Sequence, residues 1–354
     1  MHKVTVLMSV YNEQKYVKEA IESILSQTYR NYEFLIINDG STDNTREIVN
    51  SYNDPRIRLI DNSSNMGLAK SLNRGLQISQ GELIARQDAD DISDPNRLER
   101  QVKYLDVHTD VMLLGTGVRT IDEFGKPHKV ALTVPDTLTA IRWYLMFESA
   151  FAHTSVMFRR NIIYEKLGGY NEIFTRAQDY ELWSRIARVY SVANLNETLV
   201  CHRFQYESTT KRMARKDPPI EDIAHENLKV FLKSPDITSQ WASFIIPFQS
   251  RKKFSEFTDW KQAVEMYEQV WKRYCQLYPE AIFDQMTLSH YTANLYWLAY
   301  YSAPHFRRLS IQTYLSARNL LPKSCRHPSL LKYIALWFIG EKIRRKYKYL
   351  YNKK

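Results

Sequence analysis

The sequence has few cysteines, and they lie far apart. Three occur in 354 residues, at Cys201, Cys275 and Cys325, and none belongs to a CxxC pair. Disulfide frameworks and zinc sites need paired or clustered cysteines, so this spacing supports neither. It is typical of a protein from a reducing compartment.

Long apolar runs are also missing. A helix that spans a bilayer needs about 20 mostly apolar residues, and the longest candidate, YIALWFIG at 333–340, is far shorter. Near the N-terminus, VTVLMSV runs directly into YNEQKY with no small-residue cleavage site, unlike a signal peptide. We therefore expect a cytoplasmic protein that does not cross the membrane.

Acidic residues are scarce at the C-terminal end. The net charge is +10, and the segment from Arg326 onward carries +8 of it, with nine Lys or Arg and one acid, Glu341. A nucleic-acid binder usually carries a basic groove through its fold, so this distribution predicts no nucleic-acid partner. Basic residues beside Trp, Tyr and an apolar patch suit an anionic membrane surface. We predict that residues 329–354 attach the protein peripherally to the cytoplasmic face of the membrane; a solvated basic tail is the alternative.

Strand and helix signals alternate along the first 212 residues. Apolar runs typical of strands alternate with segments whose apolar residues recur at helical spacing. The predicted strands are 4–10, 32–39, 56–62, 82–88, 111–118, 154–160 and about 196–204. Later helices are predicted at about 95–107, 136–147 and 177–190. This series implies an α/β fold with a mixed, mainly parallel sheet and helices on both faces.

The character of the chain changes after about residue 212. Long amphipathic helices rich in Trp and Tyr follow, without strand signals of comparable strength. Pro218 and Pro219 make a plausible boundary. We predict an α/β domain over 1–212, a helical C-terminal subdomain over 213–328, and a basic amphipathic tail over 329–354.

Acidic residues stand where the predicted strands end. Ligands of parallel sheets bind beyond the carboxyl ends of the strands. Asp39 directly follows the apolar run FLII, a position that turn chemistry alone does not explain, although it does explain Gly40 and Asp43. The stretch ARQDADDISDP follows the fourth strand. Within it, the pair Asp94-Pro95 is a good helix start, with Asp94 as the N-cap.

The carboxylates of Asp88 and Asp90 can point into one crevice at this edge. Like charges so close repel each other, unless a divalent cation neutralises them. Mg²⁺ and Mn²⁺ are commonly held by one or two carboxylates plus substrate phosphates. The pair therefore predicts a Mn²⁺ or Mg²⁺ site and a phosphate-bearing substrate. A bare DxD is common by chance, but its place after the fourth alternating strand makes it more specific.

Two stretches resemble a known family. They are VLMSVYNEQKYVKEAIESILSQTYRNYEFLIINDGSTDNT and NMGLAKSLNRGLQISQGELIARQDADDISDPNRLERQ, and the resemblance, to family 2 glycosyltransferases of the GT-A fold, covers about residues 3–210. It implies transfer of a sugar from a nucleotide-diphosphate donor, most commonly a UDP-sugar, with inversion. The implied acceptor is a glycan or lipid-linked glycan of cell-surface polysaccharide biosynthesis.

The resemblance also implies roles for single residues. Tyr11 and Glu13 would line the base and ribose pocket, and Asp39 would accept a hydrogen bond from the base. Asp88 would bind the ribose or a metal-bound water, and Asp90 would ligate the metal. Arg86 would pair with these acids or reach the diphosphate. The complete set of expected nucleotide-sugar contacts is Ser9, Tyr11, Glu13, Asp39, Arg86, Asp88, Ala89 and Asp90.

An inverting transfer needs a general base within hydrogen-bond reach of the acceptor hydroxyl. The pair Gln178-Asp179 stands where the family has Glu-Asp, so the resemblance implies Asp179 as the base. The alternative is an ordinary first-turn acid favoured by the helix dipole. Trp183 on the same predicted helix could stack on a sugar, but its spacing favours core packing. The implied acceptor-side residues are His153, Gly168 and Gly169.

One departure from the family concerns the metal. Gln205 stands where many relatives carry a His that completes the metal site. His202 lies three residues earlier, and strand alternation predicts that it points to the opposite face. The metal would then rely on Asp90, phosphates and water.

Three competing functions make different demands on the sequence. A sugar nucleotidyltransferase would need a glycine-rich loop after the first strand, and SVYNEQKY contains no glycine. A processive polysaccharide synthase would carry a Gln-x-x-Arg-Trp motif after the base, whereas the Arg142-Trp143 pair precedes Asp179. A nucleic-acid-binding protein would use the basic C-terminus and bind in a strongly salt-dependent way.

Overall fold

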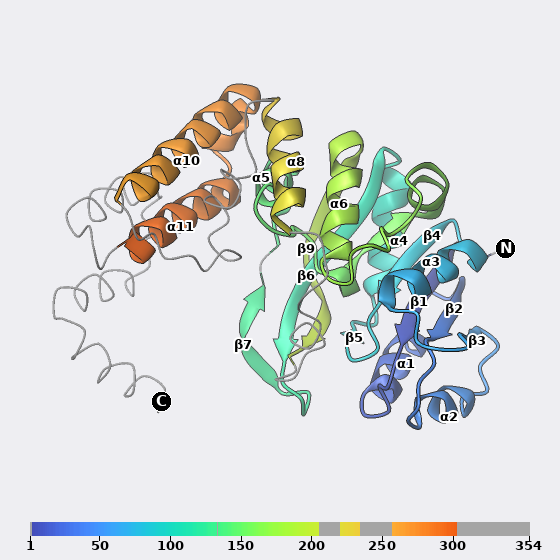
Figure 1. Ribbon diagram of the computed structural model, residues 1–354. Helices are drawn as coiled ribbons and strands as arrows, with labels where there is room; N and C mark the ends of the chain where they lie inside the picture. Colours follow the sequence, from blue (N-terminus) through green and yellow to red (C-terminus); the bar gives the residue numbers. More distant parts are fainter. Residues whose placement is uncertain (1, 133, 205–219, 234–256, 303–354) are drawn as a thin grey trace, which may run out of the picture.

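The computed structural model describes residues 2–132, 134–204, 220–233 and 257–302 (Figure 1). Gln205, the predicted boundary near residue 212 and the predicted tail 329–354 lie outside these residues. None of the described helices is long and apolar enough to cross a membrane.

The first half of the sheet is the predicted parallel series. Its elements are β1 (Val4–Val10), α1 (Val17–Leu25), β2 (Tyr32–Asn38), α2 (Thr45–Asn50), β3 (Ile57–Asp61), α3 (Leu68–Ile78) and β4 (Leu83–Gln87). The strands lie in the order β3-β2-β1-β4, all parallel. β1, β2 and β4 are rich in Val, Ile and Leu and almost fully buried, as expected where helices cover both faces.

The second half of the sheet is mixed. Its strands and helices are β5 (Ile92–Ser93), α4 (Arg97–Val107), β6 (Val111–Ile121), β7 (Pro127–Leu132), α5 (Leu138–Leu145), β8 (Met157–Arg159), α6 (Gln178–Val189) and β9 (Ser191–Arg203). A 3₁₀ turn, η1 (His153–Ser155), and a π-helical turn, η2 (Asn161–Lys166), flank β8. The order continues β4-β8-β6-β9-β5, with β7 beside β6. β8 runs antiparallel to β4 and β6, whereas β9 runs parallel to β6.

Two local predictions differ from the structure. The hairpin strand β7 was not predicted; it begins with a proline and pairs only with β6, as an edge strand can. The prediction that Asp94 is the N-cap is wrong, because α4 begins at Arg97 with Asn96 before it. Asp94 Oδ1 instead accepts a hydrogen bond from the Asn96 N–H at 2.9 Å and closes the turn that leads into the helix.

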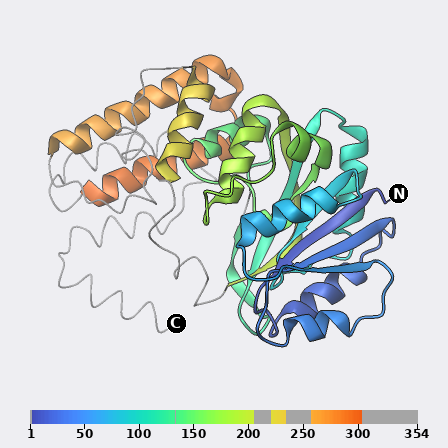
Figure 2. The ribbon, with the colours of Figure 1, turned by 45° about the vertical axis from the view of Figure 1, so that its right-hand side comes forward.

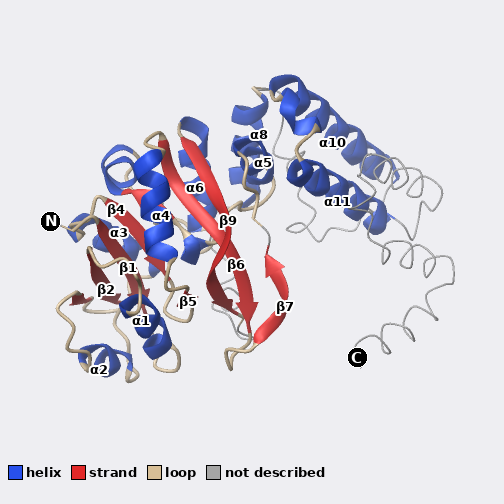
Figure 3. Ribbon diagram, turned by 180° about the vertical axis from the view of Figure 1, so that it is seen from behind, coloured by secondary structure: helices blue, strands red, loops and turns tan. Residues whose placement is uncertain are grey.

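Alternate strand residues enter two cores, one on each face of the sheet. Leu7 and Leu35 pack on the face covered by α3, α5 and α6 (Figure 1). Val6 and Phe34 pack on the face covered by α1 and α4, seen from behind in Figure 3. The prediction of helices on both faces is confirmed.

The C-terminal helices extend the first of these cores. They are α8 (Ile220–Leu232), α10 (Phe257–Leu277), the 3₁₀ turn η3 (Pro279–Ile282) and α11 (Gln285–Ser302), and they stand at one end of the sheet (Figure 2). Trp143 of α5 packs against Trp271 and Tyr274 of α10, with ring centroids 5.2 and 5.0 Å apart. Tyr267, Tyr274 and Tyr291 are core, as predicted, whereas Phe283 between η3 and α11 is 80% exposed.

Candidate active site

The loops that follow β1, β2 and β4 lie at the same edge of the sheet. Val10 pairs with Asn38 across β1 and β2, and Met8 pairs with Gln87 across β1 and β4. The residues directly beyond these ends are Tyr11, Asp39 and Asp88. The structure therefore brings together side chains that are far apart in the sequence, as the alternating pattern predicted.

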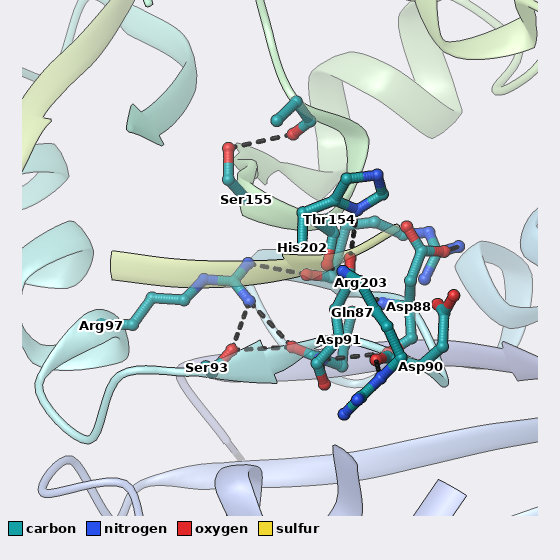
Figure 4. Close-up of polar contacts among 12 residues, drawn as sticks. Gln87, Asp88, Asp90, Asp91, Ser93, Arg97, Thr154, Ser155, His202 and Arg203 are labelled. Atoms are coloured by element: carbon teal, nitrogen blue, oxygen red, sulfur yellow. Dashed lines mark hydrogen bonds and ion pairs between the residues drawn. The ribbon is translucent and has the colours of Figure 1, made fainter. Parts of the chain in front are cut away.

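The loop after β4 divides its carboxylates between two roles. Asp91 is buried and accepts hydrogen bonds from the Arg203 backbone N–H, at 2.8 Å, and from His202 Nδ1, at 3.0 Å. Asp88 and Asp90 lie on the side of the loop away from Arg97 (Figure 4). The Asp88 side chain is 26% exposed. Asp91 therefore anchors the loop, while Asp88 and Asp90 face the predicted donor site.

Two buried arginines hold the backbone of this loop. Arg97 donates to the Arg86 carbonyl at 2.6 Å and to Gln87 Oε1 at 3.0 Å. Arg203 Nε donates to the Asp90 carbonyl at 2.9 Å, and its Nη2 pairs with Glu19 of α1 at 2.8 Å. Burial lowers the pKa of Arg97 to about 9.

Neither Arg97 nor Arg203 was identified from the sequence. The one available signal was that Arg97 shares the apolar face of its helix with Leu98, Val102 and Leu105. A charged residue at a core-facing position needs a partner to offset its burial. Nothing local marks Arg203, because its partners come from three distant segments.

Negative potential is strong around Glu13. Burial, followed by the charges of Asp90, Asp88, Asp43 and Asp91, raises the pKa of Glu13 to about 8. His202 responds to the same field: its hydrogen bond to Asp91 raises its pKa to about 9, against the effect of burial and with help from the neighbouring carboxylates. The charges at this edge therefore favour any added cation.

His202 contacts the acidic loop. β5 pairs antiparallel with β9, with Ile92 opposite Cys201, so the acidic loop runs alongside the end of β9 and His202 meets Asp91. Whether His202 and Gln205 point to opposite faces stays a prediction, because Gln205 lies outside the described residues. The short pairing between β5 and β9 has no sequence signature, which is why this contact was missed.

Asp39 shapes a neighbouring loop. Its Oδ1 accepts hydrogen bonds from Asn62 Nδ2, at 2.7 Å, and from the Met66 N–H, at 2.9 Å, and its Oδ2 accepts one from the Gly67 N–H, at 2.9 Å. Gly40 follows with φ of +73°, and a Cβ there would lie 2.7 Å from the Ser64 carbonyl carbon. Each carboxylate oxygen can accept two hydrogen bonds, so Oδ2 keeps capacity for one more. A contact from Asp39 to a base stays a prediction.

The loop after β1 is tied to the loop after β2. Asn12 adopts a left-handed conformation, with φ of 56°, and its Oδ1 accepts a hydrogen bond from the Thr42 N–H at 2.8 Å. The Glu13 N–H donates to Thr45 Oγ1 at 2.8 Å. These bonds hold Glu13 beside the acids and leave the Tyr11 side chain 44% exposed. Ser9 lies half-buried on β1 and Ala89 is buried in the acidic loop.

Asp179 lies in the first turn of helix α6 and is half-buried. The residue at the N-cap, Ala177, is left-handed with φ of 56°, a costly conformation for a non-glycine residue that recurs at functional sites. Burial raises the pKa of Asp179; backbone hydrogen bonds at the helix start and the charge of Arg86 oppose this rise, while the charge of Asp88 adds to it. A carboxylate with a raised pKa beside a donor site can serve as a general base.

His153, one of the predicted acceptor-side residues, lies against Arg86. His153 Nε2 lies 3.2 Å from Arg86 Nε, which donates to it, and 3.0 Å from the Tyr170 hydroxyl. Burial, then the charge of Arg86, lowers the pKa of His153 to about 3, so the imidazole is neutral. Trp183 is fully buried with its ring centroid 6.0 Å from that of His153, so the core role favoured by its spacing is confirmed.

The two glycines of the LGGYNE loop differ. Both have positive φ, 75° at Gly168 and 74° at Gly169. A Cβ on Gly168 would meet open space, whereas one on Gly169 would lie 2.5 Å from Asn73 Oδ1. The close backbone approach at Gly169 is therefore made to α3 of the same chain. An acceptor contact at either glycine stays a prediction.

The acids at this edge suit a divalent cation only in part. Within the described ranges, no group of three or more His, Cys, Asp or Glu is arranged to hold a metal ion. The carboxylates of Asp88 and Asp90 are nevertheless the oxygen ligands that Mg²⁺ and Mn²⁺ prefer. Together with the raised pKa of Glu13, they fit a cation whose remaining ligands come from a diphosphate and water.

Comparison with known proteins identifies the chain. The profile of the family described as Glycosyl transferase family 2 matches residues 5–167. The putative glycosyltransferase EpsE of Bacillus subtilis is 40% identical over 189 residues, 52% of this chain and, at 66%, slightly under two thirds of EpsE. The O-antigen biosynthesis glycosyltransferase WbnJ of Escherichia coli is 33% identical over 244 residues, 67% of this chain and 91% of WbnJ.

A solved structure supports the fold. The crystal structure of S. aureus TarS 1-349 in complex with UDP-GlcNAc superposes with a TM-score of 0.56 at 18% identity, over 90% of each chain. The sheet and its helices therefore have a GT-A-like fold. The chain belongs to glycosyltransferase family 2 and is an enzyme, as the sequence motifs predicted.

The raised pKa of Glu13 predicts how the stability of the protein depends on pH. Because the pKa of this carboxyl rises from 4.5 to about 8 on folding, the folded protein loses stability as the pH rises through this range. We expect Glu13→Gln, in metal-free buffer, to melt about 2 °C or more above the wild type at pH 8.5. The difference should vanish near pH 4. Thermal unfolding followed by circular dichroism measures both values.

The matched control is Glu47→Gln, on the exposed side of α2. Its melting temperature should follow the wild type across the same pH range. Equal melting temperatures of Glu13→Gln and the wild type at pH 8.5 would contradict the electrostatic account of this site.

Proposed function

We propose that this enzyme transfers a sugar from a nucleotide-diphosphate sugar, most commonly a UDP-sugar, to a glycan or lipid-linked glycan acceptor with inversion. The observation that carries the proposal is the charge at one sheet edge. Asp88 and Asp90 face the side on which Glu13 has its pKa raised to about 8, and the charge of Asp88 helps to raise the pKa of the half-buried Asp179. This arrangement provides a donor site whose negative charge attracts a cation, with a separate base near it.

The names of similar proteins support the substrate class. WbnJ is named for O-antigen biosynthesis, and the TarS structure holds UDP-GlcNAc. A role in cell-surface polysaccharide biosynthesis follows as part of the proposal. Tyr11 is exposed near Asp39, the predicted base contact, and its ring suits a nucleoside because aromatic rings stack on bases.

Asp90, with help from Asp88, would hold Mn²⁺ or Mg²⁺. A divalent cation bound here would offset the charge that builds on the departing diphosphate. The chain's own contribution is to present the two carboxylates on a fixed loop, because Arg97 and Arg203 hold its backbone.

Asp179 would take the proton of the acceptor hydroxyl. The acceptor oxygen then forms a bond to the anomeric carbon while the bond from that carbon to the diphosphate oxygen breaks. The proton ends on Asp179 and the electron pair leaves with the nucleoside diphosphate. Attack on the face opposite the leaving group inverts the anomeric centre, and the burial that raises the pKa of Asp179 strengthens it as a base.

A donor screen tests the proposed activity. The full chain is incubated with UDP-, GDP- and TDP-sugars and Mn²⁺ or Mg²⁺, and slow donor hydrolysis and thermal stabilisation are measured. We expect one donor to raise the melting temperature in a metal-dependent way, because ligand binding to the folded state stabilises it. No response to any donor with metal present would contradict the proposal.

Asp179→Asn separates catalysis from binding. The amide keeps the shape but cannot accept the proton, so transfer should fall about 1,000-fold while UDP affinity stays within about three-fold of the wild type. In the wild type, kcat should fall as the pH drops through a pKa above the usual Asp value of about 3.9. Loss of UDP binding in Asp179→Asn would contradict its role as the base.

Peripheral membrane attachment through residues 329–354 is a further part of the proposal. Those residues lie outside the described part of the chain, and their sequence carries the argument. Deleting 329–354 should move the protein from the membrane fraction to the supernatant, because seven Lys or Arg from Lys342 onward are lost. A deletion variant that still sediments with membranes would contradict this attachment.

A further inference from the structure

Arg86 is a buried cation at the centre of the site. It lies on β4 two residues before Asp88, so both side chains project from the same face of the strand. It is 1% exposed, and its Nη2 pairs with Asp88 Oδ1 at 2.5 Å. Its Nη1 donates to the Leu7 carbonyl at 3.4 Å. In this position the guanidinium is directed at a carboxylate of the donor site and is itself shielded from solvent.

Burial of a guanidinium needs a specific compensation. A charge removed from water is costly unless it is paired and hydrogen-bonded. Elsewhere the sheet fills such positions with apolar residues, as at Ile84 and Ala85 on the same strand. The pairing with Asp88 is thus the interaction that makes Arg86 tolerable, and the same pairing fixes the direction of the Asp88 carboxylate.

A network of hydrogen-bonded side chains lies on the other side of Arg86. Its Nε donates to His153, which also bonds to the Tyr170 hydroxyl. Asn73 of α3 clamps Tyr170: the Tyr170 N–H donates to Asn73 Oδ1 at 2.8 Å, and Asn73 Nδ2 donates to the Tyr170 carbonyl at 2.9 Å. Arg185 of α6 holds the Gly169 carbonyl at 2.8 Å. Arg86 is therefore fixed from both sides.

We propose that Arg86 is a positioning residue: its guanidinium, held by His153, fixes the direction of the Asp88 carboxylate without contacting the donor. The inference rests on the proposed function. It assigns Arg86 to the orientation of Asp88 in the chemical step, and leaves the main donor contacts to Tyr11, Glu13 and Asp90, with Asp88 in a supporting role.

Two substitutions and a direct binding measurement test this role. Arg86→Met removes the charge, whereas Arg86→Lys keeps the charge but lacks the branched guanidinium that reaches Asp88 and His153 together. At saturating donor and metal, kcat should fall about 100-fold in Arg86→Met and about 10-fold in Arg86→Lys. UDP affinity, measured calorimetrically with Mn²⁺ present, should stay within about three-fold of the wild type in both.

Arg159→Met is the matched control. Arg159 is also a mostly buried arginine; it lies on β8 opposite Leu83, at the other end of β4, and donates to the carbonyls of Val111 and Leu105. Its loss should lower the melting temperature and leave kcat per folded molecule within about two-fold of the wild type. A kcat loss in Arg86→Met that this control does not share separates positioning from general destabilisation.

Other outcomes overturn the inference in distinct ways. A wild-type kcat in Arg86→Lys and Arg86→Met would show that the pairing does not serve catalysis. Loss of UDP affinity with an unchanged kcat at saturation would make Arg86 a donor contact instead. If Arg86→Met does not fold, the kcat and the UDP affinity of Arg86→Lys alone test the inference. A wild type inactive toward every donor would defeat the proposed function itself, which the Arg86 variants do not address.

Discussion

Repulsion among carboxylates at one sheet edge is the constraint on which the site depends. Asp88, Asp90 and Asp91 stand within four residues, with Glu13 facing them. Each is compensated differently. Asp91 is held by the Arg203 backbone and His202, and Asp88 is paired with Arg86. Burial and the combined charge of these acids and Asp43 raise the pKa of Glu13, and a cation carrying a diphosphate would offset that charge.

The mixed second half of the sheet brings additional side chains to this edge. β9 returns beside β6 and ends against the acidic loop, so Arg203 can reach that loop, α1 and the turn after β6 at once. β8 runs antiparallel to β4, which places η1, and with it His153, next to Arg86. A purely parallel sheet would supply neither side chain. The helices α10 and α11 join the same core through Trp143, so they are continuous with the catalytic fold.

The sequence predicted the parts of this molecule that depend on local pattern. Buried strands, amphipathic helices and the acids at strand ends follow from periodicity and from turn chemistry, and the motifs pointed to the family. The edge strand β7, the bond from His202 to Asp91 and the clamp of Asn73 on Tyr170 were not predicted. The last two depend on contacts between residues 111 and 97 positions apart, which no local pattern encodes. The role of Asp94 was misread because two turn residues, Pro95 and Asn96, separate it from the helix, whereas an N-cap directly precedes the first helical residue.

We propose that Arg86 and His202 pair with Asp88 and Asp91, while Asp90 and the Glu13 side of the loop receive the metal and the donor diphosphate. A crystal structure of the chain with UDP and Mn²⁺, with the manganese located by anomalous diffraction, tests this arrangement. We expect Mn²⁺ at about 2.1 Å from an Asp90 carboxylate oxygen and from diphosphate oxygens, with the Arg86–Asp88 and His202–Asp91 contacts retained. Manganese bound by Asp91, or a diphosphate bound directly by Arg86, would contradict it.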